Sequence, residues 1–165
     1  MTVATVDNDG PDARMLLLKG VDERGFVFYT NLDSPKAVAL RNEPRVALCF
    51  HWKETEKQVR VRGTVSAVSD LEADAYFATR PRLSQISAWA SRQSRTMSGY
   101  FELEAAVSKI ALRFGVGTIP RPSFWSGFRV TPTRIEFWHG KPYRRHHRIL
   151  YIREAHGWRK TFLYP

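Results

Sequence analysis

The sequence predicts a mainly β protein with a few inserted helices, arranged as a closed or partly closed β-barrel. Short apolar or alternating segments separated by turn signals fill both ends of the chain, and helical spacing is confined to the middle. The length of 165 residues suits one domain, and a hydrophobic share of 43% is enough for a buried core. We therefore expect a single domain over residues 1–165.

The N-terminal part is expected to hold five strands and one short helix. Turn signals at residues 7–10 and 22–25 separate the first three strands, which form a β-meander. The helix is expected because Ser34 is a favoured N-cap and Pro35 a favoured first helical residue. The expected strands are residues 1–6, 14–19, 25–30, 44–52 and 58–69, and the expected helix is residues 34–42.

The rest of the chain is expected to give three helices and then four strands. Asp70 is a candidate N-cap for the first of these helices, and Leu103, Val107, Ile110 and Phe114 recur at helical spacing in the last. Residues 115–122 break the helical pattern with glycine and proline. The expected helices are residues 70–78, 82–92 and 101–114, and the expected strands are 127–131, 134–138, 148–154 and 158–163.

Charge and cysteine content narrow the class of protein. Lys and Arg number 26 against 16 acidic residues, a formal net charge of +10, which favours nucleic acid, an acidic membrane surface or a phosphorylated ligand as partner. The single Cys49 cannot form an internal disulfide and fits a reducing cytoplasm. Neither a signal peptide, a membrane span nor metal-type Cys/His spacing is visible, so we expect no membrane association and no metal.

The densest group of cationic and titratable side chains is Arg144-Arg145-His146-His147-Arg148. Such a cluster indicates either a bound anion that neutralises the charge or a role in catalysis. Lys141-Pro142 predicts a turn, and the side chains from Arg144 onward are expected to enter the next strand. Alternation then places Arg144, His146 and Arg148 in one row, and Arg145 and His147 on the opposite face.

Seven motifs resemble, in this order, those of the pyridoxamine 5′-phosphate oxidase family, flavin enzymes that make pyridoxal 5′-phosphate. The resemblance runs from about Met1 to Pro165. The motifs are Arg14-Met15-Leu16-Leu17-Leu18-Lys19, Phe28-Tyr29-Thr30-Asn31, Arg80-Pro81-Arg82, Ser84-Gln85-Ile86, Gln93-Ser94, Phe124-Trp125-Ser126-Gly127-Phe128-Arg129, and Ile135-Glu136-Phe137-Trp138 followed by Arg144-x-His146-x-Arg148.

The resemblance implies an FMN-binding split β-barrel of Greek-key type, a homodimer with FMN in clefts at the subunit interface. It implies oxidation of pyridoxamine and pyridoxine 5′-phosphates by dioxygen, yielding pyridoxal 5′-phosphate and hydrogen peroxide. It implies Arg144 and His146 as catalytic residues, and substrate contacts from these two and from Lys19, Tyr76, Arg80 and Ser84. The implied FMN ligands are Arg14, Met15, Leu16, Leu17, Leu18, Lys19, Tyr29, Thr30, Lys36, Gln58, Gln93, Ser94, Trp138 and Arg148.

These residue types suit those roles. A phosphate carries close to two negative charges. The Arg guanidinium can donate two parallel hydrogen bonds to it, and the Lys ammonium binds it as a compact positive charge. Tyr76, Arg80 and Ser84 would share one helical face if Pro81 did not end the first helix. Either Arg144 or His146 is a candidate to help a proton leave the substrate amine or hydroxyl, and the sequence does not choose between them.

The chain departs from the family pattern in several places. The family's usual N-terminal extension is absent before Met1. Pro35 stands where many members carry an Arg that donates to phosphate, and His147 and Leu83 replace frequent acids. Phe162 replaces an Arg of the C-terminal tail.

Three alternatives remain open at this point. A related split-barrel flavin oxidase, as in phenazine pathways, would use the same scaffold on another substrate. A flavin-binding protein without turnover would keep the FMN ligands alone. A nucleic-acid-binding module would use the +10 charge and the interleaved aromatic residues. However, Lys and Arg are spread over the whole chain and no nucleic-acid-binding motif is visible, so we expect no nucleic acid as partner.

Overall fold

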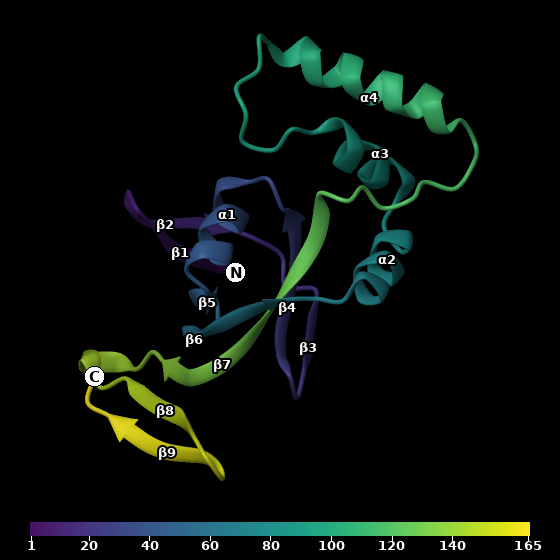
Figure 1. Ribbon diagram of the computed structural model, residues 1–165. Coiled ribbons are helices and arrows are strands. Elements are labelled where there is room, and N and C mark those ends of the chain that lie inside the picture. The colour runs from purple at the N-terminus through teal and green to yellow at the C-terminus, as the bar shows by residue number, and fades with distance from the viewer. The chain divides into compact units, whose positions relative to one another are not determined.

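The computed structural model describes all residues from Met1 to Pro165. It contains nine strands, four α-helices and one 3₁₀ helix (Figure 1). The strands are β1 (Thr2–Asp7), β2 (Gly10–Met15), β3 (Gly20–Asp22), β4 (Gly25–Asn31), β5 (Arg45–Trp52), β6 (Lys57–Ala67), β7 (Trp125–His139), β8 (His147–Glu154) and β9 (Gly157–Leu163). The helices are α1 (Pro35–Asn42), α2 (Asp70–Ala78), α3 (Arg82–Ala90), α4 (Tyr100–Phe114) and the 3₁₀ helix η1 (Pro142–Arg144).

The chain divides into two compact units. The sheet unit comprises Met1–Phe28, Ala39–Ser66 and Phe128–Pro165. The helical unit comprises Tyr29–Val38 and Ala67–Gly127. None of the helices is both long enough and apolar enough to span a membrane.

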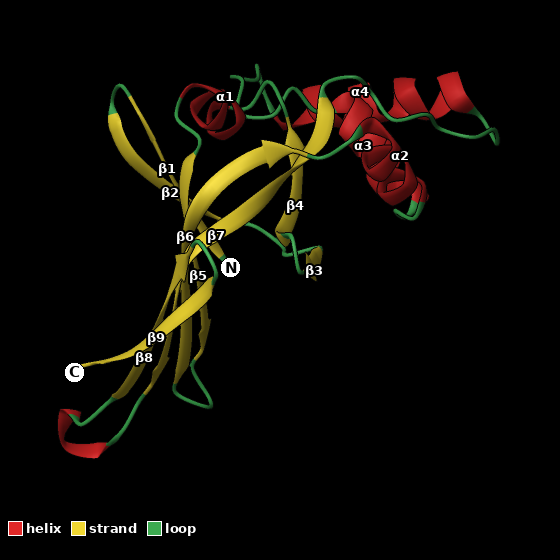
Figure 2. Ribbon diagram, turned by 60° about the horizontal axis from the view of Figure 1, so that its bottom comes forward, coloured by secondary structure: helices red, strands yellow, loops and turns green.

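The strands form one sheet in the order β2-β1-β5-β6-β7-β4-β3. Strand β8 adds to β7 outside this path, and β9 pairs with β8. Pairing is antiparallel along β2-β1-β5-β6, between β3 and β4, and along β7-β8-β9, the last ending in the C-terminal hairpin (Figure 2). The mainly β class predicted from the sequence is confirmed.

The core of the sheet unit follows from alternation along the strands. Val3 on β1, Leu48 on β5, Val61 on β6 and Val130 on β7 are each no more than 1% exposed. Phe28 is also fully buried, with its ring centroid 5.9 Å from that of Phe128. On β6, the alternation of polar and valine residues seen in the sequence gives Val61 to the core and leaves its polar neighbours more exposed.

The strand predicted at residues 14–19 is wrong in its bounds. Strand β2 begins at Gly10 and ends at Met15, because it pairs residue by residue with β1 from Asp7↔Gly10 to Thr2↔Met15. Gly10 has a φ of +117°, which suits the tight turn before it. Most of β2 is polar and carries no apolar run, because an edge strand tolerates proline and charged residues.

The two strands predicted at residues 127–131 and 134–138 are one continuous strand, β7. The predicted bounds left Pro132 and Thr133 outside both strands. The strand continues because β6, β4 and β8 all pair with it, and its residues from Trp125 to Val130 are all buried. Strand β3, only three residues long, was not predicted.

The helices match their predicted positions with two corrections. The N-cap of α2 is Ser69, whose hydroxyl accepts a hydrogen bond from the Glu72 N–H at 3.2 Å, and Asp70 is the first helical residue. Helix α3 ends at Ala90, two residues earlier than predicted. Val107, Ile110 and Phe114 of α4 pack against a buried cluster that includes Phe77 and Trp125, as their spacing predicted.

The close approach of β6 and β7 gives a stability test. A Cβ atom added at Gly63 would lie 2.1 Å from the carbonyl oxygen of Thr131, so Gly63→Ala must push two paired strands apart. We expect a loss of about 2–4 kcal/mol in the free energy of unfolding. Urea denaturation followed by circular dichroism measures this loss. Gly99→Ala is the control, because nothing lies within 4 Å of its added Cβ. Equal stability of the two variants would contradict the close approach.

Candidate functional site

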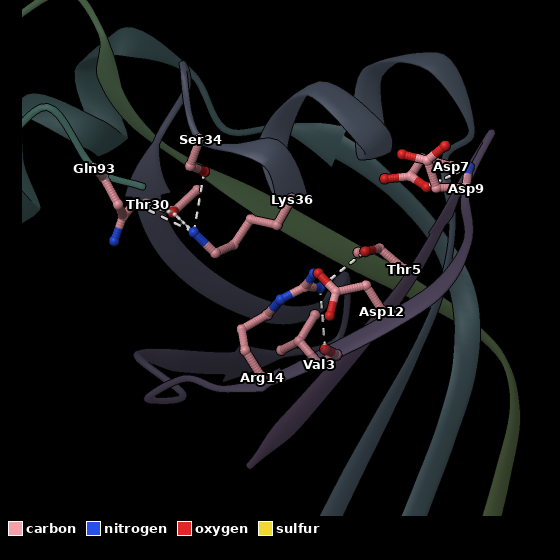
Figure 3. A network of polar contacts seen from close by, with 10 residues as sticks. All are labelled: Val3, Thr5, Asp7, Asp9, Asp12, Arg14, Thr30, Ser34, Lys36 and Gln93. Atoms are coloured by element: carbon pink, nitrogen blue, oxygen red, sulfur yellow. Dashed lines mark hydrogen bonds and ion pairs between the residues drawn. The ribbon is translucent and has the colours of Figure 1, made fainter. Parts of the chain in front are cut away.

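A buried lysine organises one end of the helical unit. Lys36 is 7% exposed, and its ammonium group donates to Thr30 Oγ1 at 3.2 Å, Ser34 Oγ at 3.0 Å and Gln93 Oε1 at 3.2 Å (Figure 3). The Ser34 hydroxyl donates in turn to the Asn31 carbonyl at 2.7 Å, where β4 passes into α1. The fold thus brings together three of the predicted FMN ligands, Thr30, Lys36 and Gln93.

Three stacked aromatic rings form a second group in the helical unit. The Tyr29 ring lies 4.1 Å from Tyr76 and 5.2 Å from Trp125, with interplanar angles of 11° and 2°. The Arg80 guanidinium lies over the Trp125 ring, 4.8 Å from its centroid, and 5.4 Å from that of Phe77. We call Tyr29, Tyr76, Arg80 and Trp125 the aromatic clamp. It joins a predicted FMN residue, Tyr29, to two predicted substrate residues.

Arg80 carries the clearest sign of a missing ligand. Its NH1 nitrogen is buried and makes no hydrogen bond. Burial lowers the pKa of the Arg80 guanidinium, and the nearby Tyr76 opposes that shift. Since arginine keeps its charge in proteins, a buried donor without a partner favours binding of an anion. Cation–π contacts with Trp125 and Phe77 orient the guanidinium in the absence of an anion.

Ser84 does not continue the helical face of Tyr76 and Arg80. Helix α2 ends at Ala78, and Pro81 is the N-cap of α3, on which Ser84 lies. The Ser84 N–H donates to the Pro81 carbonyl at 2.8 Å. The break at Pro81 that the sequence predicted is therefore confirmed.

A groove of about 880 Å³ opens in the helical unit between residues 89–97 and α4. Gln93 and Ser94 contribute to its lining, together with the apolar side chains of Trp89, Ile110 and Phe124. Ser94 has a φ of +67°, so the backbone turns sharply at this predicted FMN residue.

The first predicted FMN motif, residues 14–19, lies in the sheet unit. Its first two residues end β2, and residues 16–19 form the connection to β3. The Arg14 guanidinium donates to Thr5 Oγ1 at 2.8 Å and to the Val3 carbonyl at 3.3 Å, and it pairs with Asp12 (Figure 3). The Lys19 N–H donates to the Val27 carbonyl at 2.9 Å. Met15 and Leu17 are more than 70% exposed, so this motif presents two apolar side chains to the surface.

A polar group covers one face of three neighbouring strands in the sheet unit. The Glu136 carboxylate on β7 accepts from Arg148 Nε on β8 at 2.8 Å and from Arg60 NH1 on β6 at 3.3 Å. Trp138 is paired with Arg148 in the β7–β8 register, so the two side chains share this face. Gln58 is two residues from Arg60 on β6 and shares its parity. Two predicted FMN ligands, Trp138 and Arg148, thus share a sheet face with Glu136, and Gln58 lies on the same strand as Arg60, which also pairs with Glu136.

The predicted strand row of Arg144, His146 and Arg148 is wrong. Arg144 belongs to η1 and has a φ of +61°, next to Tyr143 with a φ of +58°. Strand β8 begins only at His147, so alternation does not apply to Arg144 and His146. The turn after Lys141 is longer than expected: Arg144 lies in η1, and His146 precedes the first residue of β8.

His146 is nevertheless held in one orientation. Its Nδ1 accepts a hydrogen bond from the Lys141 N–H at 3.1 Å, and its ring lies 4.8 Å from the Trp138 ring. Because Nδ1 accepts, the neutral imidazole carries its hydrogen on Nε2. His146 can therefore donate from Nε2 to an oxygen or nitrogen of a bound molecule.

Sequence reasoning missed Trp125, Ser34, Arg60 and Glu136. Trp125 lay inside a quoted motif, two residues before the strand predicted at 127–131, and it is in fact the first residue of β7. A glutamate within an apolar strand, Ile135-Glu136-Phe137-Trp138, is a signal that a cation must lie opposite it. The predicted ligands are also split between the two units: Tyr29, Thr30, Lys36, Tyr76, Arg80, Ser84, Gln93 and Ser94 lie in the helical unit, and the others lie in the sheet unit.

Comparisons with known proteins agree over the whole chain. Residues 1–114 match the family described as pyridoxamine 5′-phosphate oxidase. Residues 125–165 match the pyridoxine 5′-phosphate oxidase C-terminal dimerisation region. The chain is 60% identical to a pyridoxine/pyridoxamine 5′-phosphate oxidase of Azorhizobium caulinodans, covering 100% of this chain and 79% of that protein. A Chelativorans oxidase of the same name is 56% identical over 99% of this chain and 79% of its own length.

Solved structures give the same fold. PhzG of Burkholderia lata, in complex with tetrahydrophenazine-1-carboxylic acid, superimposes with a TM-score of 0.93 at 29% identity, covering 99% of this chain and 81% of that one. An FMN-binding, pyridoxamine 5′-phosphate oxidase-related protein of Nostoc punctiforme superimposes with a TM-score of 0.78 at 19% identity, covering 99% and 87%. The split-barrel fold is therefore confirmed, and the chain belongs to the pyridoxamine 5′-phosphate oxidase family.

Proposed function

We propose that this protein is a flavoprotein oxidoreductase that converts pyridoxamine and pyridoxine 5′-phosphates to pyridoxal 5′-phosphate. Dioxygen is the electron acceptor and is reduced to hydrogen peroxide with either substrate; with the amine, water is also consumed and ammonia is released. The observation that carries the proposal is the buried, unpartnered NH1 of Arg80 in the aromatic clamp. A phosphate monoester supplies the anionic acceptor that this nitrogen lacks.

The donor groups of the chain fit FMN. Lys36, Thr30 and Gln93 combine an ammonium, a hydroxyl and an amide within hydrogen-bond distance of one another, a set suited to a phosphate. Arg148, Trp138 and Gln58 share one sheet face and offer a cation, an aromatic ring and an amide to a planar polar ring system. FMN, when bound, supplies the hydride acceptor that no side chain can provide.

The remaining predicted residues bind and orient the substrate. Tyr76, Arg80, Ser84 and Lys19 offer hydroxyls and positive charge to its phosphate. His146 donates from Nε2, and Arg144 adds a fixed cation beside the reacting group. Because the Nδ1 lone pair of His146 is engaged by the Lys141 N–H, we assign His146 to hydrogen bonding and orientation of the substrate.

A phenazine-type oxidase on the same scaffold is the second candidate. The 0.93 TM-score with PhzG supports it. The sequence identity favours the B6 assignment, since it is 60% to the Azorhizobium oxidase and 29% to PhzG.

We further propose that the active form is a cytoplasmic homodimer in which residues 1–165 act as one domain. The match of residues 125–165 to the family's dimerisation region supports the dimer, as do the exposed apolar side chains Leu17, Phe137 and Tyr164. The free Cys49 is consistent with a reducing compartment.

The purified protein is expected to be yellow and to turn over pyridoxine 5′-phosphate under air. The visible flavin spectrum, formation of pyridoxal 5′-phosphate and release of hydrogen peroxide are measured together. Tetrahydrophenazine-1-carboxylic acid is the comparison substrate. Oxidation of that compound alone would favour the second candidate. A colourless protein that FMN cannot reconstitute would reject both flavin assignments.

Removing the Arg80 cation is expected to weaken recognition of the phosphate. Arg80→Leu should raise the KM for pyridoxine 5′-phosphate roughly 10- to 100-fold, because charged hydrogen bonds are worth about 1.5–3 kcal/mol. Arg113→Leu is the matched control, since the Arg113 guanidinium also lies over a tryptophan ring, 5.2 Å from that of Trp89. An unchanged KM in the Arg80 variant would remove Arg80 from the phosphate site.

Changes at Arg144 and His146 are expected to affect turnover more than cofactor content. Arg144→Ala and His146→Ala should each lower kcat roughly 100-fold or more, while the flavin absorbance per protein stays near that of the unaltered protein. Arg145→Ala, one residue away and exposed, serves as the control. If both variants keep the turnover of the unaltered protein, the catalytic assignment of Arg144 and His146 is wrong, although the family assignment still holds.

A further inference from the structure

We propose that Glu136 is a positioning residue that fixes Arg148 for FMN binding, with Arg60 as a second cation on the same carboxylate. The proposal rests on the proposed function, because it takes Arg148 to be an FMN ligand. It adds two residues, Glu136 and Arg60, that the predicted site does not contain.

The three side chains lie on three adjacent strands. Glu136 is near the end of β7 and is 9% exposed. Its Oε1 accepts from Arg148 Nε at 2.8 Å, and its Oε2 accepts from Arg60 NH1 at 3.3 Å. Each carboxylate oxygen thus holds a different guanidinium, one from β8 and one from β6.

The contacts of Arg148 leave one edge of its guanidinium available. Nε is held by Glu136, and NH1 donates to the Tyr164 carbonyl at 2.9 Å. Its NH2 makes no hydrogen bond, and the side chain is 26% exposed. The guanidinium is planar and rigid, so the hydrogen bonds of Nε and NH1 also fix the direction of NH2 before any ligand binds.

Charge also favours an anionic ligand. Two guanidiniums and one carboxylate leave the group with one net positive charge. Without Glu136, two cations on the same face would repel each other and Arg148 would lose its anchor at Nε. Glu136 therefore keeps both cations in place while leaving one positive charge for the cofactor.

Stability alone does not account for this carboxylate. A buried ion pair contributes little to folding relative to apolar side chains of the same size, and Glu136 stands among Ile135, Phe137 and Trp138. The geometry instead gives it a task at the predicted FMN ligand. A positioning role predicts that its loss is felt in FMN affinity more than in folding.

The test is FMN affinity of the full chain after removal of flavin, measured by quenching of FMN fluorescence. Glu136→Gln should raise the Kd for FMN roughly 10-fold or more, as for the loss of a group that orients a ligand-binding residue. The melting temperature of the flavin-free protein should fall less than loss of a fully buried ion pair would cause, because Arg60 and Arg148 are 45% and 26% exposed and water partly solvates both cations. Glu154→Gln is the matched control, because the Glu154–Arg159 pair, at 2.5 Å, is the same type of interaction on the exposed β8–β9 hairpin. Its Kd should match that of the unaltered protein.

A double-mutant cycle tests whether Glu136 acts through Arg148. In an Arg148→Gln background, Glu136→Gln should change the Kd less than two-fold. An equal effect in both backgrounds, or no effect in either, would overturn the proposal. If Glu136→Gln lowers the melting temperature strongly, Glu136→Asp replaces it: this variant keeps the charge but withdraws the carboxylate by one methylene, and unaltered FMN affinity in it would also overturn the proposal.

The outcomes separate this inference from the proposed function. If the unaltered chain does not bind FMN, the proposed function fails. If it binds FMN and the Glu136 variants bind equally well, only the role of Glu136 fails.

Discussion

The long strand β7 is the element on which the rest of the structure depends. It pairs with β6, β4 and β8, so the sheet branches along its length. Trp125 at its start supplies a ring of the aromatic clamp, while Glu136 and Trp138 near its end carry the polar face that holds Arg148. Such pairing requires close backbone contact, which explains why glycine is needed at position 63, opposite the Thr131 carbonyl, and at position 25, against that of Val130.

The fold holds three of the cationic side chains in distinct environments. Arg80 is stabilised by aromatic faces, Arg148 by a carboxylate, and Lys36 by hydroxyl and amide oxygens. Each environment orients the cation, and those of Arg80 and Arg148 leave a nitrogen without a hydrogen bond within the chain. This arrangement suits phosphorylated ligands better than a flat basic surface, where side chains remain solvated and unoriented.

Most elements could be predicted because their signals are local. The helix from Tyr100 to Phe114 follows from apolar spacing, and α1 follows from Ser34 and Pro35. The errors arose where pairing partners override local preference. Strand β2 is polar because it is an edge strand, and β7 continues through Pro132 because other strands pair along it. The row of Arg144, His146 and Arg148 failed for a related reason, since positive φ values at Tyr143 and Arg144 keep the chain out of the strand.

By itself, the sequence determined the family, the mainly β class and the residue types of the candidate site, because ordered motifs and periodic patterns are properties of the chain alone. Only the tertiary structure decided which of these residues meet. Tyr29, Tyr76 and Trp125 stack although they are 47 and 49 residues apart, and Arg60 reaches Glu136 across 76 residues. The physical reason is that burial and hydrogen bonding are satisfied by side chains adjacent in space, whatever their separation in sequence. The partners of Arg80, Arg148 and His146 were therefore fixed only when the strands paired and the helices packed.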